Sequence, residues 1–167
     1  FDLPAEVMHG IAELGFKYCT EIQSLSLEQA LAGKNMDYRR LAELMQSRTD
    51  VFCHIPDAIR FLAEMPEFDN TLYFHKKMKC DENVARENLA MILPVLEGIT
   101  DWTEQNLHDT VMAAIAESGK KNGAVLWPLR IAISGQESTP GGAFEIAYLL
   151  GKDESIARVE KGLEKLN

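Results

Sequence analysis

The stretch 127-WPLRIAISGQESTPGG-142 joins an apolar segment to a loop. The first half of the stretch is apolar apart from Arg130. Near the start of this half, Pro128 has no backbone N–H to donate. The second half consists largely of Ser, Thr, Pro and Gly, which is loop chemistry. We predict a short helix that starts at Pro128, because a missing N–H costs nothing in the first turn of a helix. The aliphatic residues that follow would pack inward and hold one cation beside a stiffened loop.

Outward from this stretch, apolar residues recur mainly at helical spacing. Thr103 is a typical N-cap residue for the helix that follows it. Gly119 stands where a glycine in the left-handed conformation is expected to end that helix. No segment shows clean period-two alternation, and no internal repeat is present. The fold class is therefore predicted to be all-α, with two consecutive helical bundle subdomains. The other predicted helices cover residues 3–14, 37–46, 57–63, 81–96, 103–119, 142–150 and 153–166.

The run 64-EMPEFDN-70 reads as a break between two subdomains, at 1–66 and 67–167. The chain has 167 residues and shows no signal-peptide pattern. Because it starts at Phe1 and not at an initiator Met, we expect a piece of a longer protein. No segment is apolar enough to span a bilayer, and membrane contact is not expected. Three widely separated cysteines favour a reducing compartment, and the expected location is the cytoplasm.

The charge balance restricts the possible functions. The chain has 17 basic and 26 acidic residues and a net charge of −9, so any nucleic-acid contact must use a confined basic face. Phosphate-cradling glycine motifs are absent from the sequence. Cys53 and His54 are adjacent, but no second pair supplies further metal ligands. We therefore predict no catalytic residues, no metal site and no cofactor in this chain.

Three locally basic clusters remain as candidates. The run 75-HKKMK-79 is flanked by Tyr73 and Phe74, and the other clusters contain Lys120, Lys121 and Arg130, or Arg39, Arg40 and Arg48. Taken alone, each cluster is more typical of an ordinary solvated surface than of a phosphate-binding site, given the negative net charge.

The order of the motifs adds a resemblance. From about Asp37 onward the chain contains LAELMQSR, HKKMK, DWTEQNLHDTV, KKNGAVLWPLRIAISGQESTPGG and FEIAYLLGKDESIARVEKGL, in that order. This ordered set resembles the C-terminal anticodon-binding domain of bacterial glutamyl-tRNA synthetase (glutamate–tRNA ligase), a class I enzyme. The resemblance implies a tRNA-binding module of the aminoacyl-tRNA synthetase without its catalytic domain. The parent enzyme would use ATP and Mg²⁺, and the fragment would be inactive alone.

The resemblance also implies roles for individual residues. Arg130 matches the arginine that meets the first anticodon base, and Thr139 and Pro140 match the loop that meets the middle base. Arg48 is the candidate for the third base. Gly141 and Gly142 complete the loop, although some family members carry a bulky aliphatic residue at the position of Gly142. The candidates for backbone phosphate contacts are Lys76, Lys77, Lys79, Lys120 and Lys121. We expect Arg130 and Thr139 to face one exposed groove.

The residues leave several alternatives open. Arg48 could satisfy helix-end carbonyls, Arg130 could pair with an acid, and Thr139 could cap the next helix. Trp102 and Trp127 could stack on bases, although core packing is favoured for Trp102. The expected partner is tRNA-Glu, with tRNA-Gln open, no DNA, and a monomeric state. The alternative function is an acidic helical protein–protein module, and an autonomous helical enzyme is disfavoured.

Overall fold

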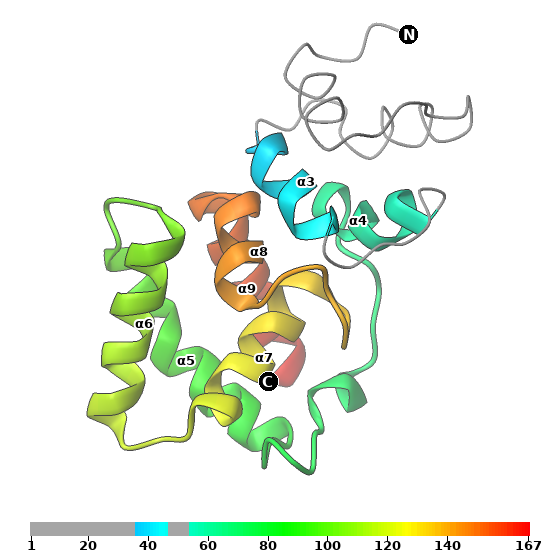
Figure 1. Ribbon diagram of the computed structural model, residues 1–167. Coiled ribbons are helices and arrows are strands. Elements are labelled where there is room, and N and C mark those ends of the chain that lie inside the picture. The colour runs from blue at the N-terminus through cyan, green and yellow to red at the C-terminus, as the bar shows by residue number, and fades with distance from the viewer. Residues whose placement is uncertain (1–35, 47–53) are drawn as a thin grey trace, which may run out of the picture. The chain divides into compact units, whose positions relative to one another are not determined.

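The computed structural model describes residues 36–46 and 54–167 (Figure 1). The chain divides into two compact units, Phe1–Met65 and Pro66–Asn167. The boundary predicted from the sequence falls one residue later, between residues 66 and 67. The helix predicted over residues 3–14 lies outside the described residues. No helix in the described ranges is long and apolar enough to cross a membrane.

The first unit contains two described helices, α3 (Tyr38–Gln46) and α4 (Ile55–Ala63). The stripe predicted for α3 is confirmed, because Leu41, Leu44 and Met45 are buried. In α4, a proline stands in the first turn, where its missing N–H has no intrahelical partner to lose. Both helices are therefore amphipathic and start where the sequence chemistry favours a start.

The second unit is built from a short 3₁₀ helix and five α-helices. Asp81 and Thr103 cap α5 and α6, accepting hydrogen bonds from the backbone N–H groups of Val84 (2.9 Å) and Asn106 (3.3 Å). Gly119 ends α6 in the left-handed region at φ 68°, as predicted. The described residues form no strand, which agrees with the predicted all-α class. The elements are η2 (Asn70–Tyr73), α5 (Glu82–Gly98), α6 (Glu104–Ser118), α7 (Asn122–Ser134), α8 (Ala143–Leu150) and α9 (Lys152–Leu166).

Helix α7 is the central element of this unit. It packs against α5, α6, α8, α9 and η2, as the yellow ribbon in Figure 1 illustrates. Its apolar side chains, including Leu129, Ile131 and Ile133, are buried as predicted. A Cβ atom on Gly162 of α9 would lie 3.2 Å from the Cβ of Ala132, so a glycine lets α9 approach α7 closely.

The start of α7 differs from the prediction. The helix begins at Asn122, and Pro128 lies in its interior. A proline there cannot donate to the carbonyl of the residue four positions earlier, which is Ala124. That carbonyl instead accepts a hydrogen bond from Asn88 Nδ2 of α5 at 2.6 Å. The prediction of a proline-started helix was wrong because a side chain from another helix replaces the lost backbone bond.

Candidate nucleic-acid interface

Arg130 is held on α7 by an aromatic side chain one turn earlier. Its guanidinium carbon lies 5.0 Å from the ring centroid of Trp127, a cation–π arrangement, and Arg130 is half-buried. The Trp127 indole donates its N–H to the carbonyl of Tyr73 at 3.2 Å and is only 7% exposed. Trp127 is therefore a buried support for Arg130, and stacking on a base is excluded for it in this conformation.

The loop that follows α7, residues 136–142, is less open than expected. Thr139, Pro140 and Gly141 are buried, and Thr139 is 6% exposed. The Thr139 hydroxyl donates to the carbonyl of Gly141 at 2.5 Å. The expectation that Thr139 faces an exposed groove beside Arg130 is therefore wrong for this conformation. The physical reason is local, since the hydroxyl finds an acceptor two residues away in its own turn. The contact between Thr139 and the middle anticodon base stays a prediction.

Gly142 is the N-cap residue of α8 and has an ordinary φ of −78°. Backbone conformation therefore does not require glycine at this position. A Cβ atom built there would lie 2.9 Å from Glu145 Oε2, the end of a flexible side chain. The Glu145 carboxylate thus occupies the space beside Gly142 that a side chain would enter.

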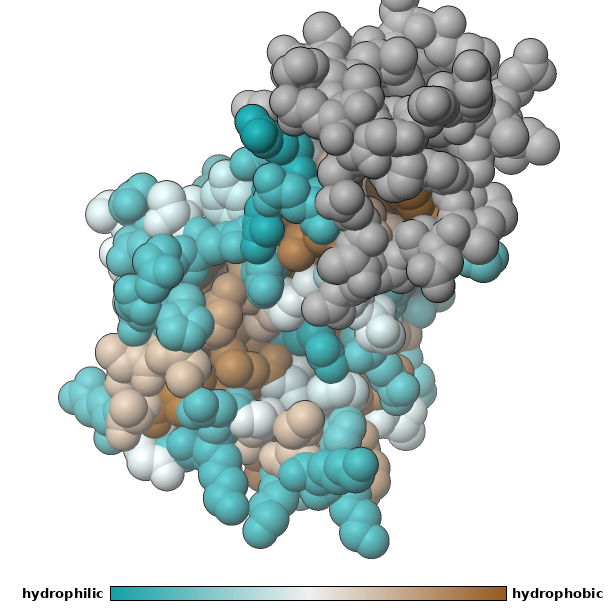
Figure 2. Space-filling view, in the orientation of Figure 1, coloured by the Kyte–Doolittle hydropathy of each residue, from teal (hydrophilic) through white to brown (hydrophobic). Residues whose placement is uncertain are grey.

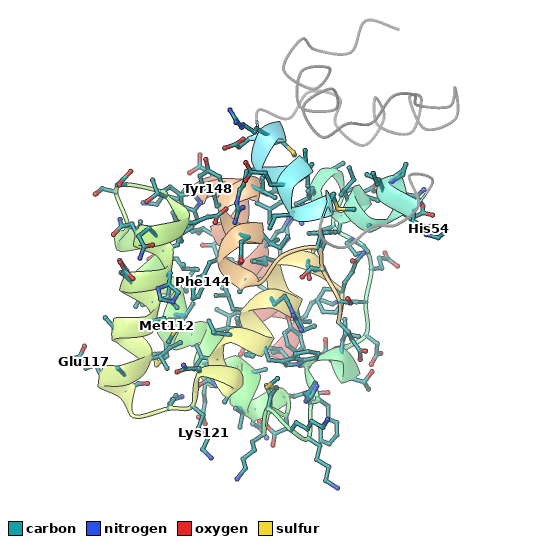
Figure 3. The ribbon with its side chains drawn as sticks, viewed as in Figure 1. His54, Met112, Glu117, Lys121, Phe144 and Tyr148 are labelled. Atoms are coloured by element: carbon teal, nitrogen blue, oxygen red, sulfur yellow. The ribbon has the colours of Figure 1, made fainter. Side chains whose placement is uncertain are left out.

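The predicted phosphate-binding lysines separate into two groups. Lys76, Lys77 and Lys79 are exposed in the turn that links η2 to α5, and Lys121 is exposed at the N-cap of α7. Figure 3 shows the Lys121 side chain pointing away from the helices at the lower end of the view. In Figure 2 the same end carries several projecting hydrophilic side chains.

Lys120 differs from these four residues. It is half-buried, and its ammonium group donates to Asn88 Oδ1 at 2.5 Å and lies 3.9 Å from Glu87 Oε2. Asn88 thereby links Lys120 to the carbonyl of Ala124. Sequence spacing did not single out Asn88. The available signal was Pro128, since a proline inside a helix leaves one identifiable carbonyl in need of a donor.

The remaining basic residues of the prediction belong to the first unit. Arg48 lies outside the described residues. Arg39 and Arg40 of α3 both approach Glu43, at 3.8 Å and 3.1 Å. These arginines are therefore engaged with a carboxylate of their own helix.

The buried groups beside the lysines are uncharged near neutral pH. Burial raises the pKa of the Cys80 thiol to about 11, and burial also raises the pKa of Tyr73. Across the described ranges, no group of three or more His, Cys, Asp and Glu side chains is placed to hold a metal ion. This end of the unit presents exposed lysines, and Arg130 lies over the Trp127 ring.

Comparison with known proteins gives the family and the fold. A family model described as an anticodon binding domain matches residues 18–163. The glutamate–tRNA ligase of Clostridium acetobutylicum is 48% identical over 133 residues, which is 80% of this chain and 27% of the relative. The glutamate–tRNA ligase of Clostridium tetani is 47% identical over 133 residues, which is again 80% of this chain and 27% of the relative. The chain therefore spans about 27% of the length of these curated relatives.

A solved structure shares the fold. The crystal structure of a glutamate tRNA ligase from Elizabethkingia meningosepticum, in complex with its amino acid, matches with a TM-score of 0.66 and 19% identity. The match covers 97% of this chain and 30% of that chain. At this identity the likeness concerns the fold alone.

Proposed function

Because this chain belongs to the anticodon-binding domain family, we propose that it binds the anticodon loop of tRNA-Glu. The supporting observation is the family match over residues 18–163, together with 48% identity to a glutamate–tRNA ligase. Bound in this way, the tRNA would be presented to a catalytic domain that attaches glutamate with ATP and Mg²⁺. We propose that the domain works as a monomer in the cytoplasm.

The division of labour follows from the chemistry of the residues. Unpaired loop bases expose the edges and faces that proteins can read in RNA. Arg130 carries a planar group with several donors, and Trp127 limits the orientations of that group before RNA arrives. Less conformational entropy is then lost on binding. We assign Arg130 to the first anticodon base, and the backbone of residues 139–142 to the middle base.

The test compares Arg130→Ala with the unchanged chain, using tRNA-Glu and a transcript whose first anticodon base is altered. We expect the unchanged chain to prefer tRNA-Glu. Arg130→Ala should lose about 10- to 100-fold of that preference, the range for one specific arginine–base contact. Filter binding gives the two dissociation constants for each chain, and circular dichroism checks that helicity is retained.

Arg86→Ala is the matched control, because Arg86 is an exposed arginine of α5 that donates to Asn83 Oδ1 at 3.2 Å, within its own helix. This variant should keep both the affinity and the preference. If Arg130→Ala keeps its helices and the full preference, base reading by Arg130 is refuted and the residue has a structural role. If the unchanged chain fails to bind tRNA at all, the proposed function itself is refuted.

A further inference from the structure

The turn between η2 and α5 has a fixed backbone shape, although it contains neither proline nor glycine. The backbone groups of His75 and Cys80 exchange two hydrogen bonds, of 2.9 Å and 3.2 Å, in an antiparallel bridge. Inside the bridge, the N–H of Lys79 donates to the carbonyl of Lys76 at 3.3 Å. Lys79 adopts a left-handed conformation at φ 54°, which is uncommon for a residue with a side chain. The shape of this loop is therefore set before any ligand binds.

Two side chains attach this loop to α7. The His75 ring packs edge-on against Trp127 with centroids 4.3 Å apart, and His75 Nδ1 accepts from the N–H of Met78 at 3.3 Å. The Met78 sulfur lies against Gly123, only 2.6 Å from where a Cβ atom would stand. A glycine at that point of α7 therefore makes room for the loop.

Four side chains next to these anchors are exposed. Phe74 is 63% exposed, and Lys76, Lys77 and Lys79 are exposed as well. Phe74 precedes His75 on extended backbone, where successive side chains leave on opposite faces, so the contact of His75 with Trp127 directs Phe74 to solvent. Single exposed apolar residues are ordinary on protein surfaces. Here, however, the exposed large hydrophobic residues of the described ranges are Phe74 and Met78, both in or beside one loop.

The charge of this segment is the reverse of the charge of the whole chain. The chain carries a net charge of −9, yet residues 70–80 include three lysines and no acid. Asp81, the first acid after the loop, is engaged in capping α5 through the N–H of Val84. Proteins that bind single-stranded nucleic acid without sequence preference combine cations for the backbone with an aromatic surface for the bases. A protein partner offers no equal reason for three cations around one aromatic ring.

We propose that Phe74 stacks on an unpaired nucleotide of the bound RNA while Lys76, Lys77 and Lys79 contact the neighbouring phosphates. This inference rests on the proposed function and deepens it by naming a second contact site for the same RNA. Phe74 supplies a flat apolar surface that accepts any base, so the site contributes affinity and little sequence discrimination. The lysines contribute a salt-dependent attraction.

The experiment measures tRNA-Glu binding by fluorescence anisotropy between 50 and 200 mM salt for variants of Phe74. Phe74→Ala should raise the dissociation constant about 5- to 100-fold and leave the salt dependence unchanged, because one stacked base is lost and no charge is removed. Phe74→Tyr should bind like the unchanged chain, since the ring is kept. Phe74→Leu, which keeps apolar volume without a ring, should resemble Phe74→Ala.

A second arm separates charge from stacking. The triple variant Lys76→Ala, Lys77→Ala, Lys79→Ala removes three proposed phosphate contacts. Each contact on a single strand contributes roughly 0.7 to the steepness with which the logarithm of the association constant falls with the logarithm of the salt concentration. The variant should therefore reduce this steepness by about two. Lys161→Ala is the matched control, because Lys161 is exposed on α9 and lies outside the loop. It should leave the slope unchanged. An unchanged slope in the triple variant would refute the phosphate contacts.

The outcomes also separate this inference from the proposed function. If Phe74→Ala binds tRNA as tightly as the unchanged chain while Arg130→Ala loses its anticodon preference, the stacking proposal fails and the function stands. If Phe74→Leu binds like the unchanged chain while Phe74→Ala does not, the contact is merely apolar and stacking is refuted. If the unchanged chain does not bind tRNA, both proposals fail.

Discussion

The two loops that meet opposite ends of α7 have opposite characters. The loop of residues 136–142, after the end of α7, buries three consecutive residues and uses the Thr139 hydroxyl within its own backbone. The loop of residues 75–80, beside the start of α7, turns three lysines to solvent, next to the exposed Phe74. Protein contacts to phosphates position a nucleic acid, whereas contacts to bases specify its sequence. The open loop, residues 75–80, therefore presents cations that suit a phosphate backbone, whereas the closed loop, residues 136–142, uses its hydroxyl internally.

This separation explains how an acidic chain serves as a nucleic-acid-binding domain. Net charge describes solubility and long-range association, and the local field near a contact depends on the few charges there. Lys76, Lys77 and Lys79 lie within four positions of one another, and Lys120 is withdrawn to Asn88. Three exposed cations are thus concentrated in one turn, and other exposed cations, such as Lys121 and Lys161, lie singly elsewhere.

The largest expected effect comes from damaging the helix on which both loops depend. Asn88→Ala removes the donor to the Ala124 carbonyl and the acceptor for Lys120. We expect the free energy of unfolding to fall by about 2 to 3 kcal/mol, because buried polar groups lose their partners. Urea denaturation followed by circular dichroism measures this change.

A double-mutant cycle with Pro128→Ala tests whether Asn88 compensates for the hydrogen bond that Pro128 cannot make. Alanine at this position restores the N–H that can donate to the Ala124 carbonyl, so Asn88→Ala should cost about 1 to 2 kcal/mol less in that background. Equal costs in both backgrounds would show that Asn88 does not compensate for Pro128.

A smaller effect distinguishes the two loops directly. Thr139→Val keeps the shape of the side chain and removes its hydroxyl, so stability should fall by about 1 kcal/mol. Lys77→Ala, in the open loop, should change stability by less than about 0.5 kcal/mol. The order should reverse for the salt dependence of tRNA binding, which Lys77→Ala should weaken and Thr139→Val should leave unchanged. A salt slope that follows Thr139 instead of Lys77 would contradict the assignment.

The smallest effect concerns the base of the open loop and appears only in alkaline solution. Burial raises the pKa of Cys80 from an ordinary value near 9.0 to about 11. The folded state therefore holds this proton more tightly than the unfolded state, and the associated stability is present below pH 9 and is lost as pH rises toward 11. The urea midpoint should fall between pH 8.5 and about 10.5.

Cys80→Ala serves as the control for this pH dependence. The variant should lose part of the alkaline decrease, and the remainder would reflect Tyr73, whose pKa is also raised by burial. An identical decrease in both chains would show that Cys80 ionisation does not contribute.

Predictions from local chemistry agreed with the structure where a residue interacts within its own element. Thr103 caps α6, Gly119 ends it, and the stripe Leu41, Leu44 and Met45 is buried. The prediction failed at Pro128, because the donor for the freed carbonyl comes from Asn88, 36 positions away from Ala124. For the candidate site, sequence order indicated Arg130 and the lysines, but their burial depends on neighbours that spacing does not specify.

The sequence by itself determined that this chain is helical, where most of its helices begin and end, and which family it resembles, because caps, stops and apolar spacing act within a few residues of one another. Only the tertiary structure decided which groups near α7 remain exposed to solvent. Packing withdrew Lys120 to Asn88, placed His75 against Trp127 and left Phe74 in solvent. The physical reason is that exposure and polar pairing are set by residues distant in the chain, whereas helix formation is set mainly by near neighbours.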